Sequence, residues 1–144
     1  VLRQLINKKL IDYIAMDLKA PLDERYHVAC GKRVDLDLIR ESIALLRTMG
    51  VNYEFRTTLV PGIVGEQEIV EIAREIQGAH KYVLQRFVPE NSLDKGLRDR
   101  VPYDDSFISH LVEKAKEYVE ICYYRGRTGA GLSTQGGLFN EEDL

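Results

Sequence analysis

The chain has 144 residues, of which 44% are hydrophobic and 30% are charged, and it carries a formal net charge of −3. This length suits a single domain with a hydrophobic core. The slightly acidic balance, without a cluster of Lys and Arg, argues against binding to nucleic acid. Apolar runs also fall short of the ~20 residues that a membrane span needs. We therefore expect a cytoplasmic protein that binds neither nucleic acid nor membranes.

Hydrophobic periodicity divides the chain into alternating helices and strands. Asp35 is a typical N-cap residue, and Gly50 and Gly78 follow the ends of two apolar stripes at helical spacing. Pro21 ends the first predicted strand, because proline cannot donate to a ladder. In chain order, the expected elements are a helix over residues 2–10, a strand over 13–19, a polar loop over 21–34, a helix over 35–49, a strand over 53–60, a helix over 66–77, a strand over 82–88, a long loop over 89–103, a helix over 105–119 and a short strand over 121–124.

Strands that alternate with helices of this length predict parallel βαβ units. The predicted fold class is therefore α/β, with three main parallel strands. Residues 126–137 contain 5 of the 11 glycines. We therefore expect a folded unit over residues 1–124 and a flexible, glycine-rich tail over 125–144.

Polar side chains occur on all three main strands. Alternation places Asp17 and Lys19 on one face of the first strand, and Glu54 and Arg56 on one face of the second. Gln85 lies near the end of the third strand. Ligands of α/β proteins bind at the carboxyl ends of parallel strands, so this pattern predicts a site for a zwitterionic or polyhydroxylated ligand. The alternative is a network of structural ion pairs, and these residues alone leave it open.

The sequence offers no nucleophile and no metal-ligand set. No Ser or Cys stands with a His in a catalytic motif. Cys30 and Cys122 are far apart in the sequence and form no metal-ligand spacing, so we expect reduced thiols, as in cytoplasmic proteins. We therefore assign no catalytic residue and no metal ligand.

Three stretches of the chain together resemble a known family. They are DYIAMDLKAP at residues 12–21, YEFRTTLVPG at 53–62 and KYVLQRFVP at 81–89. Together they are similar to the C-terminal half of radical SAM enzymes. The closest subgroup is the glycyl-radical activating enzymes, such as the activating protein of anaerobic ribonucleoside-triphosphate reductase and the pyruvate formate-lyase activating enzyme. The resemblance implies a partial (β/α) barrel, half of a radical SAM barrel.

The resemblance also implies a cofactor, a partner and site residues. In this family S-adenosylmethionine binds against a [4Fe-4S] cluster, which reduces it to a 5′-deoxyadenosyl radical. The radical installs a glycyl radical on a partner enzyme such as anaerobic ribonucleotide reductase. Asp17 and Lys19 match the family's Asp-x-Lys motif and Arg56 matches the arginine before its Val-Pro-Gly turn, so all three are expected to contact S-adenosylmethionine. Val88 aligns with the family's ribose-binding histidine, which leaves Gln85 as a candidate substitute.

The chain departs from this family in its cysteines. The family's cluster is held by a C-x3-C-x2-C loop, and two cysteines cannot supply three ligands. The chain also begins at Val1 rather than Met. We therefore expect the back half of a longer enzyme, inactive alone, with the cluster only in the full-length parent. The first strand would then lack a neighbour and favour a homo-oligomer. The alternatives are a non-catalytic β/α module that binds a ligand or partner, and an unrelated β/α enzyme.

Overall fold

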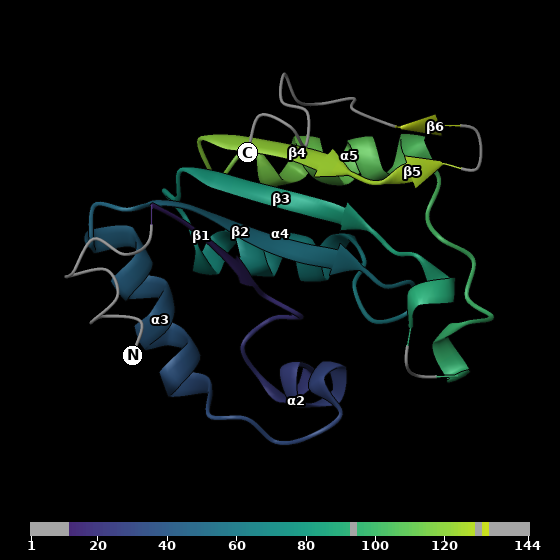
Figure 1. Cartoon of the computed structure of the whole chain (residues 1–144), viewed down its shortest axis with the longest axis horizontal. Coiled ribbons are helices and arrows are strands. Elements are labelled where there is room, and N and C mark those ends of the chain that lie inside the picture. The colour runs from purple at the N-terminus through teal and green to yellow at the C-terminus, as the bar shows by residue number, and fades with distance from the viewer. Residues whose placement is uncertain (1–11, 93–94, 129–130, 133–144) are drawn as a thin grey trace.

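The computed structural model describes residues 12–92, 95–128 and 131–132 (Figure 1). Four strands and four α-helices make up most of this part of the chain, with two short 3-10 helices between β3 and α5 and a two-stranded hairpin after β4. In chain order the elements are β1 (Tyr13–Asp17), α2 (Glu24–Cys30), α3 (Leu36–Thr48), β2 (Asn52–Leu59), α4 (Glu66–Glu75), β3 (Lys81–Arg86), η1 (Pro89–Asn91), η2 (Lys95–Leu97), α5 (Asp105–Ala115), β4 (Ile121–Arg125), β5 (Arg127–Thr128) and β6 (Gly131–Leu132).

The four longer strands form one parallel sheet in the order β1-β2-β3-β4. Each strand therefore pairs with the next one along the chain, and each connection contains at least one helix. This arrangement confirms the predicted α/β class and is consistent with a partial β/α barrel. The short strand predicted at 121–124 is a full member of the sheet, so the sheet has four parallel strands where we expected three main ones.

The sheet has one apolar face and one polar face. Helices α4 and α5 lie on the same side of it (Figure 1). Phe55 and Leu84 from the sheet are buried there in one cluster with Ile69 of α4 and Leu111 of α5. Strand alternation turns the intervening side chains to the opposite face. The polar side chains on this face are Tyr13, Asp17, Glu54, Arg56, Thr58, Lys81, Gln85, Tyr123 and Arg125, which we call the polar face.

Helix α2 lies in the segment that we expected to be a polar loop over residues 21–34, so that prediction was wrong. The Asp23 carboxylate accepts a hydrogen bond from the Arg25 N–H and caps the helix, and Gly31 ends it with a left-handed φ of 72°. Tyr26 is the helix's one buried residue, which leaves no apolar stripe for a periodicity argument to detect. The Arg25 guanidinium pairs with Glu71 of α4 and holds the pKa of that carboxyl below its usual value.

Other element boundaries differ from the prediction by a few residues. The last helix was expected over 105–119 but ends at Ala115, and the loop over 89–103 contains the two 3-10 helices. The predicted helix over 2–10 lies outside the described residues, as does most of the tail, and the division at residue 124 stays a prediction. Among the described residues, none of the helices has both the length and the apolar character needed to cross a bilayer. The cytoplasmic location also stays a prediction.

Candidate functional site

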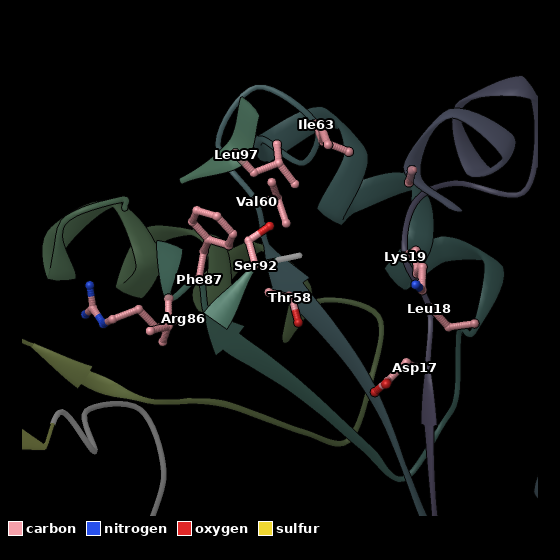
Figure 2. Close-up of a pocket in the computed structure, with 12 residues that line it drawn as sticks. Asp17, Leu18, Lys19, Thr58, Val60, Ile63, Arg86, Phe87, Ser92 and Leu97 are labelled. Carbon is pink, nitrogen blue, oxygen red and sulfur yellow. The ribbon is translucent and has the colours of Figure 1, made fainter. Parts of the chain in front are cut away.

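A pocket of about 420 Å³ lies at the carboxyl ends of β1, β2 and β3. Its volume falls within the range of small-molecule sites, and its position is the one that α/β proteins use for ligands. Figure 2 shows Asp17 and Lys19 on one side of this pocket and Arg86 and Phe87 on the other, with Thr58 between them. The lining residues are Asp17, Leu18, Lys19, Ala29, Thr58, Val60, Ile63, Arg86, Phe87, Val88, Ser92 and Leu97.

The two charged residues at the end of β1 both line the pocket, as the alternation predicted. Leu18, between them, is buried in the apolar core, and this forces its two neighbours to the other side of the strand. Asp17 is 60% exposed, and Lys19 is also exposed. The pocket therefore presents a carboxylate and an ammonium group from alternate positions, 17 and 19, at the end of β1.

Arg56 lies on the polar face beside Asp17, to which it is directly opposite in the sheet register. Its Nε donates to Asp17 Oδ1 at 3.1 Å. It is absent from the pocket lining. The structure therefore brings Asp17, Lys19 and Arg56 to one strand end, with Arg56 bound to the carboxylate rather than open to the pocket. Whether any of the three contacts S-adenosylmethionine stays a prediction.

Gln85 does not line the pocket but contacts a residue that does. The Thr58 hydroxyl, which lines the pocket, donates to Gln85 Oε1 at 3.5 Å. Val88, which aligns with the family's ribose-binding histidine, does line the pocket. Our sequence reasoning missed Thr58 as a pocket residue, although alternation placed it on the same face as Arg56 and its position near the end of β2 was a usable signal.

The middle of the polar face is closed by a hydrogen-bonded network. Glu54 is 1% exposed and accepts a hydrogen bond at 3.0 Å from Arg125 Nη2 and another from the Tyr13 hydroxyl. The guanidinium of Arg125 also lies over the ring of Tyr123 and donates to its hydroxyl at 2.9 Å. Burial raises the pKa of Tyr13 above its usual value, and the hydrogen bond to the Glu54 carboxylate raises it further. This part of the face matches the structural alternative that the sequence left open.

No family model and no solved structure matches the chain. It is 31% identical over 133 residues to a protein of Methanocaldococcus jannaschii named provisionally as a glycyl-radical enzyme activating enzyme. The match covers 90% of this chain and 55% of the relative, so the chain spans about half the length of the curated relative it matches.

The two cysteines do not fit an iron–sulfur cluster. Cys122, on β4, lies in the apolar core, where burial raises the pKa of its thiol to about 12. Cys30 is at the end of α2. Such clusters are held by cysteine thiolates, and a C-x3-C-x2-C loop supplies three of them. Within the part of the chain that the structure describes, no group of three or more His, Cys, Asp or Glu side chains is placed to hold a metal ion.

Proposed function

We propose that this chain is part of a glycyl-radical enzyme activating enzyme of the radical SAM family and that its pocket binds S-adenosylmethionine. Three observations support the proposal. The relative from M. jannaschii bears the name of such an enzyme, and the match covers 90% of this chain. Asp17 and Lys19 carry the family's strand motif, and both line a pocket at the carboxyl end of a parallel sheet. The third observation is that the pocket's polar groups suit this ligand.

Each polar group has a role in this proposal. The Lys19 ammonium binds the carboxylate of the methionine moiety, and the Asp17 carboxylate accepts hydrogen bonds from the ribose hydroxyls or from the ammonium group. Arg56 holds Asp17 in place and adds a positive charge beside the ligand. Gln85 acts through Thr58 at the ribose side. Bound beside a reduced [4Fe-4S] cluster, S-adenosylmethionine would supply the radical chemistry that removes a hydrogen atom from a glycine of the partner enzyme.

The cluster itself belongs to residues outside these 144 in this proposal, because the chain contains two cysteines. The chain alone is then inactive, and the complete enzyme installs a glycyl radical on a partner such as anaerobic ribonucleotide reductase. A second candidate is a non-catalytic module that binds a ligand through the same pocket, and the lack of a cysteine set favours it. A C-x3-C-x2-C motif encoded upstream in the same reading frame decides for the activating enzyme.

Calorimetric titration of S-adenosylmethionine into the purified chain tests the proposal. We expect saturable binding of one molecule per chain. Lys19→Ala should weaken the affinity by about tenfold, since a charge-assisted hydrogen bond contributes about 1.5 kcal/mol or more. Lys32→Ala is the matched control, because Lys32 is exposed and absent from the pocket lining. Equal affinities of the two variants, or no binding by the wild-type chain, contradict the proposed site.

A further inference from the structure

The end of β1 is attached to β2 through both peptide units that flank Leu18. The Leu18 N–H donates to the Arg56 carbonyl at 2.7 Å, and the Leu18 carbonyl accepts from the Thr57 hydroxyl at 2.8 Å. The register of β1 and β2 ends at the pair of Asp17 and Arg56. The hydroxyl of Thr57 therefore continues the attachment one peptide unit past the end of the strand, at the unit that joins Leu18 to Lys19.

The Thr57 hydroxyl is itself held by the hydroxyl of Tyr82. Thr57 Oγ1 lies 2.6 Å from the Tyr82 hydroxyl. A threonine hydroxyl has one proton and a carbonyl can only accept, so Thr57 donates to Leu18 and Tyr82 donates to Thr57. Both side chains are buried, with 1% of Thr57 and 0% of Tyr82 exposed. Burial also raises the pKa of Tyr82 above its usual value, so this phenol keeps the proton that it donates.

These two hydroxyls lie on the apolar face of the sheet, where polar groups are costly unless they are paired. Val and Phe would fill the same volumes without hydroxyls, so packing alone does not require Thr57 and Tyr82. What the hydroxyls add is a fixed position for the Leu18 carbonyl. The next residue is Lys19, which lines the pocket.

We infer that Thr57 and Tyr82 are positioning residues for the ligand site: by fixing the Leu18 carbonyl from the apolar face, they hold Asp17 and Lys19 toward the pocket. The inference rests on the proposed function for the identity of the ligand. The hydrogen-bond chain itself does not depend on that identity. The two can therefore be tested separately, one by spectroscopy on the free chain and the other by binding.

The sequence allows the hydrogen bond to the Leu18 carbonyl to be observed directly by NMR. Leu18 and Lys19 form the only Leu-Lys step in the chain. Labelling with carbonyl-13C leucine and 15N lysine therefore gives a single carbonyl–amide correlation peak, which reports the Leu18 carbonyl. Thr57→Val should move the carbonyl frequency of this peak upfield and speed the exchange of the Lys19 amide hydrogen, and Thr57→Ser should restore both. An unmoved peak in Thr57→Val overturns the inference.

Binding of S-adenosylmethionine supplies the functional readout. Thr57→Val should weaken the affinity by roughly three- to tenfold, the factor that corresponds to the net free energy of one hydrogen bond. Thr57→Ser should bind like wild type. Thr48→Val is the matched control, since the Thr48 hydroxyl donates to the Ala44 carbonyl at 2.9 Å in α3 and does not line the pocket. Wild-type affinity in Thr57→Val overturns the positioning role, even when the carbonyl peak moves.

A double variant and a separate criterion distinguish failure to fold, failure of the proposed function and failure of the inference. Thr57→Val leaves the buried Tyr82 hydroxyl without its acceptor, so the double variant Thr57→Val/Tyr82→Phe, which removes both hydroxyls, should fold where the single variant fails. The same peak and the same titration are then read on it. If the wild-type chain does not bind S-adenosylmethionine, the proposed function fails. The inference about the strand end is in that case judged by the Leu18 carbonyl peak.

Discussion

Two carboxylates on the polar face stand on neighbouring strands, and each is bound to an arginine. Glu54, in the middle of β2, is 1% exposed and is held by Arg125 and Tyr13. Asp17, at the end of β1, is 60% exposed and is held by Arg56 at 3.1 Å. The chemistry of the two pairs is the same, and the position along the strand differs. In the middle of the sheet the neighbouring side chains cover the pair, while at the carboxyl ends of the strands the carboxylate lines a pocket.

The two ion pairs are expected to contribute differently to the free energy of unfolding. A buried ion pair is desolvated, so removing one partner leaves a buried charge without compensation. An exposed pair is screened by water and contributes about 0–1 kcal/mol. The centre of the polar face is therefore expected to contribute to stability. The end of β1 keeps charged groups that are available to a ligand at little cost to the fold.

Breaking the buried pair should have the largest effect. Glu54→Ala leaves the Arg125 guanidinium, whose side chain is 12% exposed, without its carboxylate. We expect the free energy of unfolding to fall by about 3–5 kcal/mol. Urea denaturation followed by circular dichroism measures it. Glu41→Ala is the control, because Glu41 is exposed on α3. A loss below about 1 kcal/mol would place Glu54 with the exposed pairs and contradict the distinction between the two carboxylates.

An intermediate effect is expected from Tyr13 at alkaline pH. Its pKa is raised in the folded chain, mainly by burial and then by Glu54, while in the unfolded chain it ionises near pH 10. Below about pH 10 the phenol is protonated in both states, and its stabilising contribution is fully present. As the pH rises further, the unfolded chain releases the proton first and stability falls.

The variant Tyr13→Phe should therefore lose stability less steeply above about pH 10 than wild type does. Urea midpoints at a series of pH values from neutral to alkaline measure the two slopes. Tyr53→Phe is a suitable control, since the Tyr53 hydroxyl accepts from the His80 N–H and takes no part in the polar-face network. The same pH dependence in wild type and Tyr13→Phe would show that folding does not raise the pKa of this phenol.

The sequence predicts the open part of the polar face better than the closed part. Alternation along β1 and β2 suffices to bring Asp17, Lys19 and Arg56 together, because these positions depend on local geometry and on parallel pairing. The partner of Glu54 is Arg125, from a strand two places away in the sheet. Their meeting depends on β4 joining the sheet and on a side chain that reaches past β3.

Hydrophobic periodicity also could not predict the residues that line the pocket opposite the end of β1. They include Ser92 and Leu97, which lie in the segment over 89–103 that we expected to be a long loop, and Val88, which we expected at the end of the third strand but which follows β3. Helix α2 contributes Ala29, and its single buried side chain gives no periodic signal. The charged strand end is thus encoded locally, while the apolar side of the pocket depends on how the connections fold back over the sheet.

Formation of a homo-oligomer through the edge strand β1 stays a prediction.

The smallest effect is expected from the exposed pair itself. A double-mutant cycle with Asp17→Asn, Arg56→Gln and the double variant isolates the coupling between the two side chains, which are 60% and 29% exposed. We expect a coupling energy of about 0.2–1 kcal/mol in unfolding free energy at low salt. It should vanish at about 1 M salt, where the Debye length is about 3 Å. Urea denaturation of the four proteins at both salt concentrations measures it. A coupling above about 2 kcal/mol that persists in salt would mean that Asp17 is as tightly bound as Glu54. Asp17 would then be unavailable to a ligand, and the assignment of the β1 end as a binding site would fail.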